Sequence, residues 1–233
     1  MDDISCLAQC KCNEGWDGSD CSVKSKDMES KVKLRDSMME SMTNVLGTVD
    51  DAGVVSALAN VQMMVQSPNE ISTASSKLAV TATQNMLKLS AKSKLPYEKL
   101  LSTLNTLDNI QTAMTKNAKS KRRRLLTDTS SNDTRAVFDS VITMSSIIMS
   151  QMVEGQTPVT QINGNIRMST EVVASKGNQV KVLTPLTYME QQSDVVPFGV
   201  AISNMAQPNA VKVTTMFIML SSYQHHNHYY HNR

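Results

Sequence analysis

All four cysteines of this 233-residue chain lie within its first 21 residues, at Cys6, Cys10, Cys12 and Cys21. Cysteines this close together indicate either a small disulfide-bonded module or a metal site. A zinc site prefers C-x-x-C pairs at both ends, and that arrangement is absent. We therefore expect disulfides and an oxidising, extracellular setting. Four cysteines allow three pairings, and their spacing does not choose among them.

Glycine and aromatic residues stand at fixed positions between these cysteines. The segment reads Cys10-Lys-Cys12-Asn-Glu-Gly15-Trp16-Asp-Gly18-Ser-Asp-Cys21. This pattern resembles the C-terminal half of an EGF-like module. Residues 1–24 would then be part of such a module. The resemblance implies a Cys12–Cys21 disulfide. It also implies that Cys6 and Cys10 pair with each other or with cysteines of a missing upstream segment. Calcium is not expected, because calcium-binding modules take acidic ligands from the region before their first cysteine, and this N-terminal part of the module is missing.

Residues 27–118 show the helical period of apolar residues that predicts a helical bundle. The four stripes are Val32, Met38, Met39, Met42, Val45 and Leu46; Val54, Leu58, Val61 and Met64 or Val65; Ile71, Ala74, Leu78, Ala82, Met86 and Leu89; and Leu100, Leu101, Leu104, Leu107, Ile110 and Met114. We assign them to the core, and Ser67 to the cap of the third helix. Most of the 17 methionines are assigned to core filling, with a methionine-rich binding groove as the alternative.

Residues 119–133 form a basic segment followed by a Ser/Thr/Asp/Asn-rich one, which predicts an exposed loop. Arg122, Arg123 and Arg124 look like a processing site of a secreted protein; the alternatives are a solvated charge run and a nuclear signal. The nuclear signal conflicts with the EGF-like cysteines. Asn132 begins an N-x-T sequon, so we expect glycosylation there.

Residues 134–233 are expected to contain a final helix and then an antiparallel β-sandwich. The helix stripe is Val137, Val141, Met144, Ile148 and Met152. The strands are predicted over residues 159–162, 166–173, 180–183, 195–203 and 211–220, with a hairpin turn at Asn163-Gly164. The fold class is therefore predicted to be α+β.

The order of these parts resembles the GAIN domain of adhesion receptors and of polycystin or egg-jelly-receptor ectodomains. An EGF-like end comes first, a helical bundle follows, and a last helix leads into a sandwich. Gly155-Gln-Thr-Pro-Val159 and Asn165-Ile166-Arg-Met168-Ser169 are similar to the start of that family's sandwich. The resemblance covers about residues 28–233. Autoproteolysis is not expected, because the family's cleavage site has paired Cys and Trp residues and this chain has no Cys after Cys21 and no Trp besides Trp16.

The four histidines gather near the C-terminus, at His225, His226, His228 and His231. Such a tract can bind zinc, copper or nickel, and a polar tail is the alternative. Elsewhere we see no paired carboxylates, no Ser/His/Asp set and no Gly-rich phosphate loop, so neither catalysis nor a cofactor is expected. The net charge of +2 is too balanced to indicate nucleic-acid binding.

These features predict an extracellular or cell-surface, non-enzymatic fragment of a larger protein. It would act as a binding or scaffold segment for protein or glycan ligands. One alternative is a structural glycoprotein that self-assembles into a filament, coat or flagellar appendage. Another is a metal-binding protein that uses the histidine cluster. The chain shows neither a signal peptide nor an apolar run of the ~20 residues that span a bilayer. We therefore expect an incomplete chain that reaches a membrane only through segments beyond it.

Overall fold

The computed structural model describes residues 12–18, 20–46, 49–50, 52–121, 129–173, 180–183, 185–192, 199–202 and 211–218. These residues form helices and small antiparallel sheets, which confirms the α+β class in outline. The helices are α1 Ser25–Leu46, α2 Val54–Val65, α3 Thr73–Lys92, α4 Ser102–Lys121, α5 Thr129–Gln151 and α6 Tyr188–Gln191, with the 3₁₀ helices η1 Pro68–Glu70 and η2 Tyr97–Leu100. The strands are β1 Trp16–Asp17, β2 Val23–Lys24, β3 Val159–Ile162, β4 Ile166–Val173, β5 Val180–Leu183, β6 Gly199–Ile202 and β7 Val211–Ile218.

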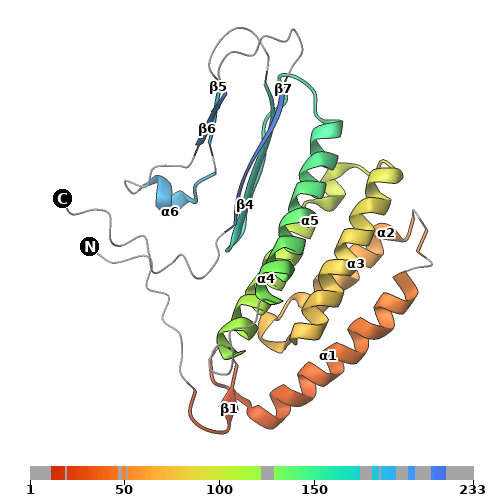
Figure 1. Cartoon of the computed structure of the whole chain (residues 1–233), viewed down its shortest axis with the longest axis vertical. Coiled ribbons are helices and arrows are strands. Elements are labelled where there is room, and N and C mark those ends of the chain that lie inside the picture. The colour runs from red at the N-terminus through yellow and green to blue at the C-terminus, as the bar shows by residue number, and fades with distance from the viewer. Residues whose placement is uncertain are drawn as a thin grey trace, which may run out of the picture.

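Helices α1 to α5 pack side by side around one continuous core (Figure 1). Helix α1 lies on the outer side of the bundle, and α5 lies beside the sheet. The predicted stripe of the last long helix is buried throughout, at Val137, Val141, Met144, Ile148 and Met152. Because each helix is amphipathic, this shared core is what stabilises the helices.

The start of α3 differs from the expectation that Ser67 caps the helix. Residues Pro68–Glu70 form the 3₁₀ turn η1, and the Ser67 side chain makes no capping hydrogen bond. The N-cap is Ser72, whose Oγ accepts a hydrogen bond from the backbone N–H of Ser75 at 3.0 Å. A Ser-Pro start suits a 3₁₀ turn as well as an α-helix, so the local sequence did not separate the two.

The predicted loop over residues 119–133 is also shorter than expected. Helix α4 continues to Lys121 and α5 already begins at Thr129, while residues 122–128 lie outside the described part. Ser, Thr, Asn and Asp are favoured in loops and at helix N-termini alike. The polar composition of this segment therefore concealed the first turn of α5.

The central sheet has the strand order β3-β4-β7, and all its pairs are antiparallel. One face of β4 is turned toward the bundle, since the Ser145 hydroxyl of α5 donates a hydrogen bond to Met168 Sδ at 3.0 Å. A second sheet of β5 and β6 lies on the side of β7 away from α5 (Figure 1). None of the helices in the described part is long and apolar enough to cross a membrane.

Candidate functional site

The structure describes only some of the side chains that the sequence marks as functional. Cys12 and Cys21 are joined by a disulfide with their Cα atoms 5.2 Å apart, which is the pairing that the EGF-like resemblance implies. Asn132 is exposed and lies in the first turn of α5 rather than in a loop. The other marked residues lie outside the described part: Cys6, Cys10, Arg122, Arg123, Arg124, His225, His226, His228 and His231.

The disulfide closes a small hairpin of β1 and β2. The strands pair Trp16 with Lys24 and Asp17 with Val23. Two turns of this hairpin use glycine at positive φ, +83° at Gly15 and +99° at Gly18, where a residue with a Cβ would be strained. The hairpin is therefore held by one covalent bond and by turns that need its glycines.

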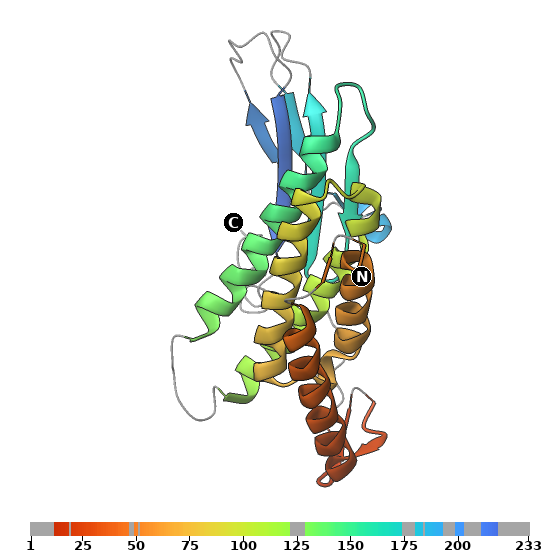
Figure 2. The same ribbon diagram turned by 90° about the vertical axis from the view of Figure 1, so that its right-hand side faces the viewer.

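This hairpin continues into α1 without a linker, because β2 ends at Lys24 and α1 begins at Ser25. The backbone N–H of Ser25 donates to the carbonyl oxygen of Gly15 at 2.9 Å. Met28, in the first turns of α1, is buried, and its methyl group lies close to Gly18. Both views place the hairpin against the N-terminal end of α1 (Figures 1 and 2).

Two neighbouring residues of α1, Arg35 and Asp36, bind the ends of two other helices. Arg35 donates from Nη1 to the carbonyl oxygen of Met64, in the last turn of α2, at 2.7 Å, and pairs with Glu70 at 2.6 Å. Asp36 accepts hydrogen bonds from the hydroxyls of Ser72, at 2.7 Å, and Ser75, at the start of α3. The positive charge of Arg35 thus lies at the C-terminus of α2, and the negative charge of Asp36 lies at the N-terminus of α3. Both placements are favourable for the helix dipoles.

Glu70 adds a charged contact to the same junction, because Lys31 also reaches it at 3.3 Å. Burial raises the pKa of the Glu70 carboxyl, but hydrogen bonds from Arg35 and Lys31 outweigh that effect and hold it below its ordinary value. Glu70 is therefore ionised at neutral pH and contributes to fixing α1 on the bundle.

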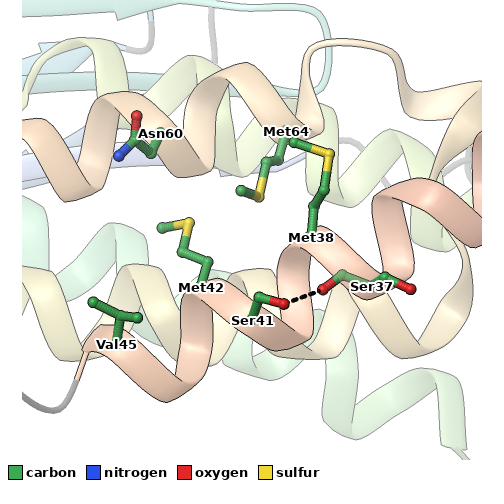
Figure 3. A pocket seen from close by; sticks show the side chains of 7 residues that line it. All are labelled: Ser37, Met38, Ser41, Met42, Val45, Asn60 and Met64. Atoms are coloured by element: carbon green, nitrogen blue, oxygen red, sulfur yellow. Dashed lines mark hydrogen bonds between the residues drawn. The ribbon is translucent and has the colours of Figure 1, made fainter.

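An open groove of about 470 Å³ runs between α1 and α2. Figure 3 shows its lining, which is Ser37, Met38, Ser41, Met42, Val45, Asn60 and Met64. None of these side chains is charged. Met38 is 47% exposed and Val45 61% exposed, so their assignment to the core was wrong. Met39 occupies the core position instead, and Met38, which points about 100° away from it around the helix, borders the groove.

The turn between β3 and β4 is fixed to the bundle by a buried carboxylate. Asp108 of α4 accepts a hydrogen bond from the backbone N–H of Asn165 at 2.5 Å. The Asn165 side chain donates to the hydroxyl of Thr112 at 2.8 Å. A Cβ at Gly164 would lie 3.3 Å from Asp108 Oδ2, so glycine permits this close approach.

The outer face of the sheet carries a second fixed charge pair, Arg167 of β4 with Glu190 of α6. The two N–O distances are 2.7 and 2.8 Å. The Arg167 guanidinium beside it, helped by the N–H and hydroxyl of Thr187, lowers the pKa of Glu190 from its ordinary value of 4.5 to about 2. Both side chains are largely shielded from solvent, and the pair acts as a structural link between two segments.

Across the described residues, no group of three His, Cys, Asp or Glu side chains is placed to hold a metal ion. Sequence comparison found no match to a known protein-family model and none to a curated protein. On the described surface, the disulfide hairpin lies at the end of α1 and the groove lies between α1 and α2.

Proposed function

We propose that this chain is an extracellular, non-enzymatic scaffold or binding segment of a larger cell-surface or secreted protein. The observation that carries the proposal is the direct continuation of the disulfide hairpin into α1. A disulfide in so small a hairpin suits an oxidising compartment. The absence of linker residues between Lys24 and Ser25 suits a segment that holds neighbouring parts at a fixed orientation.

In this proposal residues 1–24 are the end of an EGF-like module. The helices and strands from residue 28 onward correspond to a GAIN-like ectodomain, with the two sheets as parts of an antiparallel sandwich. Three features support this reading: the Cys12–Cys21 pairing, the order of hairpin, helices and strands, and the antiparallel pairing in both sheets. The exposed Asn132 would carry an N-linked glycan, since its sequon is accessible at the helix start.

The scaffold role follows from how firmly α1 is attached along its length. Its first turns pack on the hairpin through Met28, and Arg35 and Asp36 fix its middle to α2 and α3. A force or a rotation applied at the hairpin is therefore passed to the bundle through a continuous helix. Protein or glycan ligands bound at the hairpin would be presented in one orientation, which lowers the entropic cost of binding.

The test is surface labelling of intact cells from the natural source with a membrane-impermeant amine reagent. Lys24 and Lys26 are exposed beside the hairpin and would be modified. The matched controls are permeabilised cells and an abundant cytosolic protein in the same sample. Labelling of these lysines in intact cells supports the proposal. Labelling that requires permeabilisation refutes an extracellular role.

A structural glycoprotein that self-assembles is the second candidate, and one observation favours it. Among the strands that the structure describes, β3 forms an edge of the central sheet, and its Ile162 is 37% exposed. An exposed edge strand can pair with a strand of another chain. Sedimentation over a range of concentrations tests this candidate, with Ile162→Lys expected to weaken association because a lysine on an edge opposes strand pairing. Metal binding by His225, His226, His228 and His231 stays a prediction.

A further inference from the structure

We propose that Asp17 and Gly18 form a self-modifying site, at which the backbone nitrogen of Gly18 attacks the Asp17 side chain and converts Asp17 to isoaspartate. This conversion loosens the disulfide hairpin from α1. The inference stands on the geometry of the hairpin alone and goes beyond the scaffold function, so either can fail without the other.

The two reacting groups are already in contact in the hairpin. The Gly18 backbone N–H donates a hydrogen bond to Asp17 Oδ1 at 2.7 Å. The Asp17 carboxyl carbon is one C–O bond of about 1.2 Å beyond that oxygen, so it lies within about 4 Å of the Gly18 nitrogen. Reacting atoms that are held about 3–3.5 Å apart are close to the geometry of attack. Only a small rotation of the Asp17 side chain therefore separates this contact from a reactive one.

Glycine at position 18 permits the attack. It has no Cβ that would hinder the approach of the Asp17 side chain to its nitrogen. Its φ of +99° also makes glycine the residue that this turn favours. Asp17 and Gly18 are both only partly buried, so water reaches them. Ring formation and the hydrolysis that follows can therefore both take place in the folded protein.

The reaction exchanges one bond at the Asp17 carboxyl carbon. The Gly18 nitrogen bonds to that carbon, and the bond from the carbon to one oxygen of the protonated carboxyl group breaks. This oxygen leaves as water with the carboxyl proton and the amide proton, and a cyclic imide remains. A water molecule then adds to one of the two ring carbonyls. Addition at the side-chain carbonyl restores aspartate, whereas addition at the backbone carbonyl gives isoaspartate, with no net change in mass.

The pair Asn163-Gly164 provides a comparison within the same chain. In free peptides an Asn-Gly pair forms this ring more readily than an Asp-Gly pair, because an amide is a better electrophile than a carboxylate. In the fold, the Asn163 amide donates to the Ile162 carbonyl oxygen at 3.1 Å and accepts from the Asn105 backbone N–H at 3.2 Å. Partners other than the attacking nitrogen thus hold this side chain. We therefore expect folding to favour the reaction at Asp17 and to hinder it at Asn163.

Isoaspartate at position 17 disturbs the junction between the hairpin and α1. It adds one carbon to the main chain, inside a strand where Asp17 pairs with Val23. Gly18 lies close to α1, because a Cβ built on it would be 3.6 Å from Val23 Cγ2 and 3.8 Å from Met28 Cε. The added carbon therefore breaks the register of β1 with β2 and displaces Gly18 from Met28.

The test compares the purified, disulfide-bonded full chain with the same chain unfolded in guanidinium chloride with its disulfide reduced. Both are stored in mildly acidic buffer, which supplies the protonated carboxyl group. Trypsin then releases residues 12–24, which contain Asp17, and residues 136–167, which contain Asn163. Electron-transfer fragmentation distinguishes isoaspartate at Asp17 from isoaspartate at Asp20, and deamidation of Asn163 is measured from its gain in mass. Asp17→Glu is the matched variant, because it keeps the carboxylate but would need a larger ring that forms more slowly.

The expected result is that isoaspartate accumulates at Asp17 at least about tenfold faster in the folded chain than in the unfolded one, because positioning accelerates such steps strongly. Deamidation of Asn163 should instead be slower in the folded chain. Asp17→Glu should remain unmodified at position 17.

Hydrogen exchange measures the consequence for the junction. The Ser25 N–H, which donates to the Gly15 carbonyl oxygen at 2.9 Å, should exchange faster in stored wild type in proportion to its isoaspartate content. In stored Asp17→Glu this exchange rate should not change. Isoaspartate at Asp17 that forms no faster in the folded chain than in the unfolded one would overturn the proposal. Isoaspartate that leaves the exchange of Ser25 unchanged would overturn it as well.

Discussion

Arg167 in the middle strand of the central sheet and Glu190 in α6 are joined by a two-pronged ion pair, with N–O distances of 2.7 and 2.8 Å. The two residues are 23 positions apart along the chain. Arg167 is 10% exposed and Glu190 27% exposed, so the pair is largely shielded from water. It fixes α6, which lies between the two strands of the second sheet in the sequence, onto the outer face of β4.

The first prediction concerns the pH dependence of this pair. The folded pKa of Glu190, about 2, lies below its ordinary value of 4.5, which is what the unfolded chain has. The contribution of Glu190 is therefore complete above pH 4.5 and is lost as the pH falls toward 2. Glu190→Gln should lower the free energy of unfolding by about 1.5–3 kcal/mol at pH 6, because it removes a charged hydrogen-bond acceptor.

Urea denaturation of both proteins between pH 2 and 6 checks this prediction. The difference between the wild type and Glu190→Gln should shrink steadily below pH 4.5. Glu171→Gln is the control for loss of a β4 carboxylate outside the pair. A difference that stays constant with pH would contradict the assigned role of the ion pair.

The second prediction separates the two candidate caps of α3. Ser72→Ala should lower the free energy of unfolding by about 1–2 kcal/mol, because it removes the N-cap hydrogen bond to Ser75 and the hydrogen bond to Asp36. Ser67→Ala should change it by less than about 0.5 kcal/mol, since the Ser67 side chain makes no capping bond. Chemical denaturation of both variants measures this. The opposite order of effects would restore Ser67 as the helix cap.

The third prediction concerns the attachment of the sheet to the bundle. Asp108→Ala removes the acceptor for the Asn165 backbone N–H and should cost about 1–3 kcal/mol of unfolding free energy. In this variant the amide hydrogen of Asn165 should exchange faster than in the wild type, and the amides in the core of α5 should change much less. The control is Asp139→Ala on the exposed face of α5. An unchanged exchange rate at Asn165 would show that Asp108 does not hold the turn.

The fourth prediction uses Trp16, the only tryptophan of the chain, as a reporter of the hairpin. Reduction of the Cys12–Cys21 disulfide should change the Trp16 fluorescence, because the hairpin loses its covalent closure, worth about 2–3 kcal/mol. The helical signal in circular dichroism should remain, since the core of α1–α5 contains no cysteine. Helix loss in step with the fluorescence change would contradict this separation.

The sequence predicted those features that depend on local periodicity. The α5 stripe is buried as expected, and the strands at residues 159–162, 166–173 and 180–183 have the expected bounds. These predictions succeeded because period 3.6 and period 2 are properties of neighbouring residues. The cap of α3 and the start of α5 were misplaced, because the same polar residues suit loops, 3₁₀ turns and helix starts.

Contacts between distant segments could not be predicted in this way. The pair Arg167–Glu190 depends on how α6 folds back onto β4, and the pair Asp108–Asn165 depends on how the sheet lies on the bundle. The groove could not be predicted because Met38, Met39 and Met42 fit one apolar stripe, and periodicity does not show which edge of that stripe meets the neighbouring helices. In the structure Met39 is buried, whereas Leu34, Met38 and Val45 are exposed.

The most direct test of the scaffold proposal is peptide mapping, without reduction, of protein purified from its natural source after rapid alkylation. Trypsin cuts after Lys11 and Lys24 and releases residues 12–24, which contain both Cys12 and Cys21. The account predicts this peptide unalkylated and lighter by two hydrogen atoms, because the two cysteines are bonded to each other. Recovery of the peptide with both cysteines alkylated would contradict the disulfide and, with it, the argument for an extracellular scaffold.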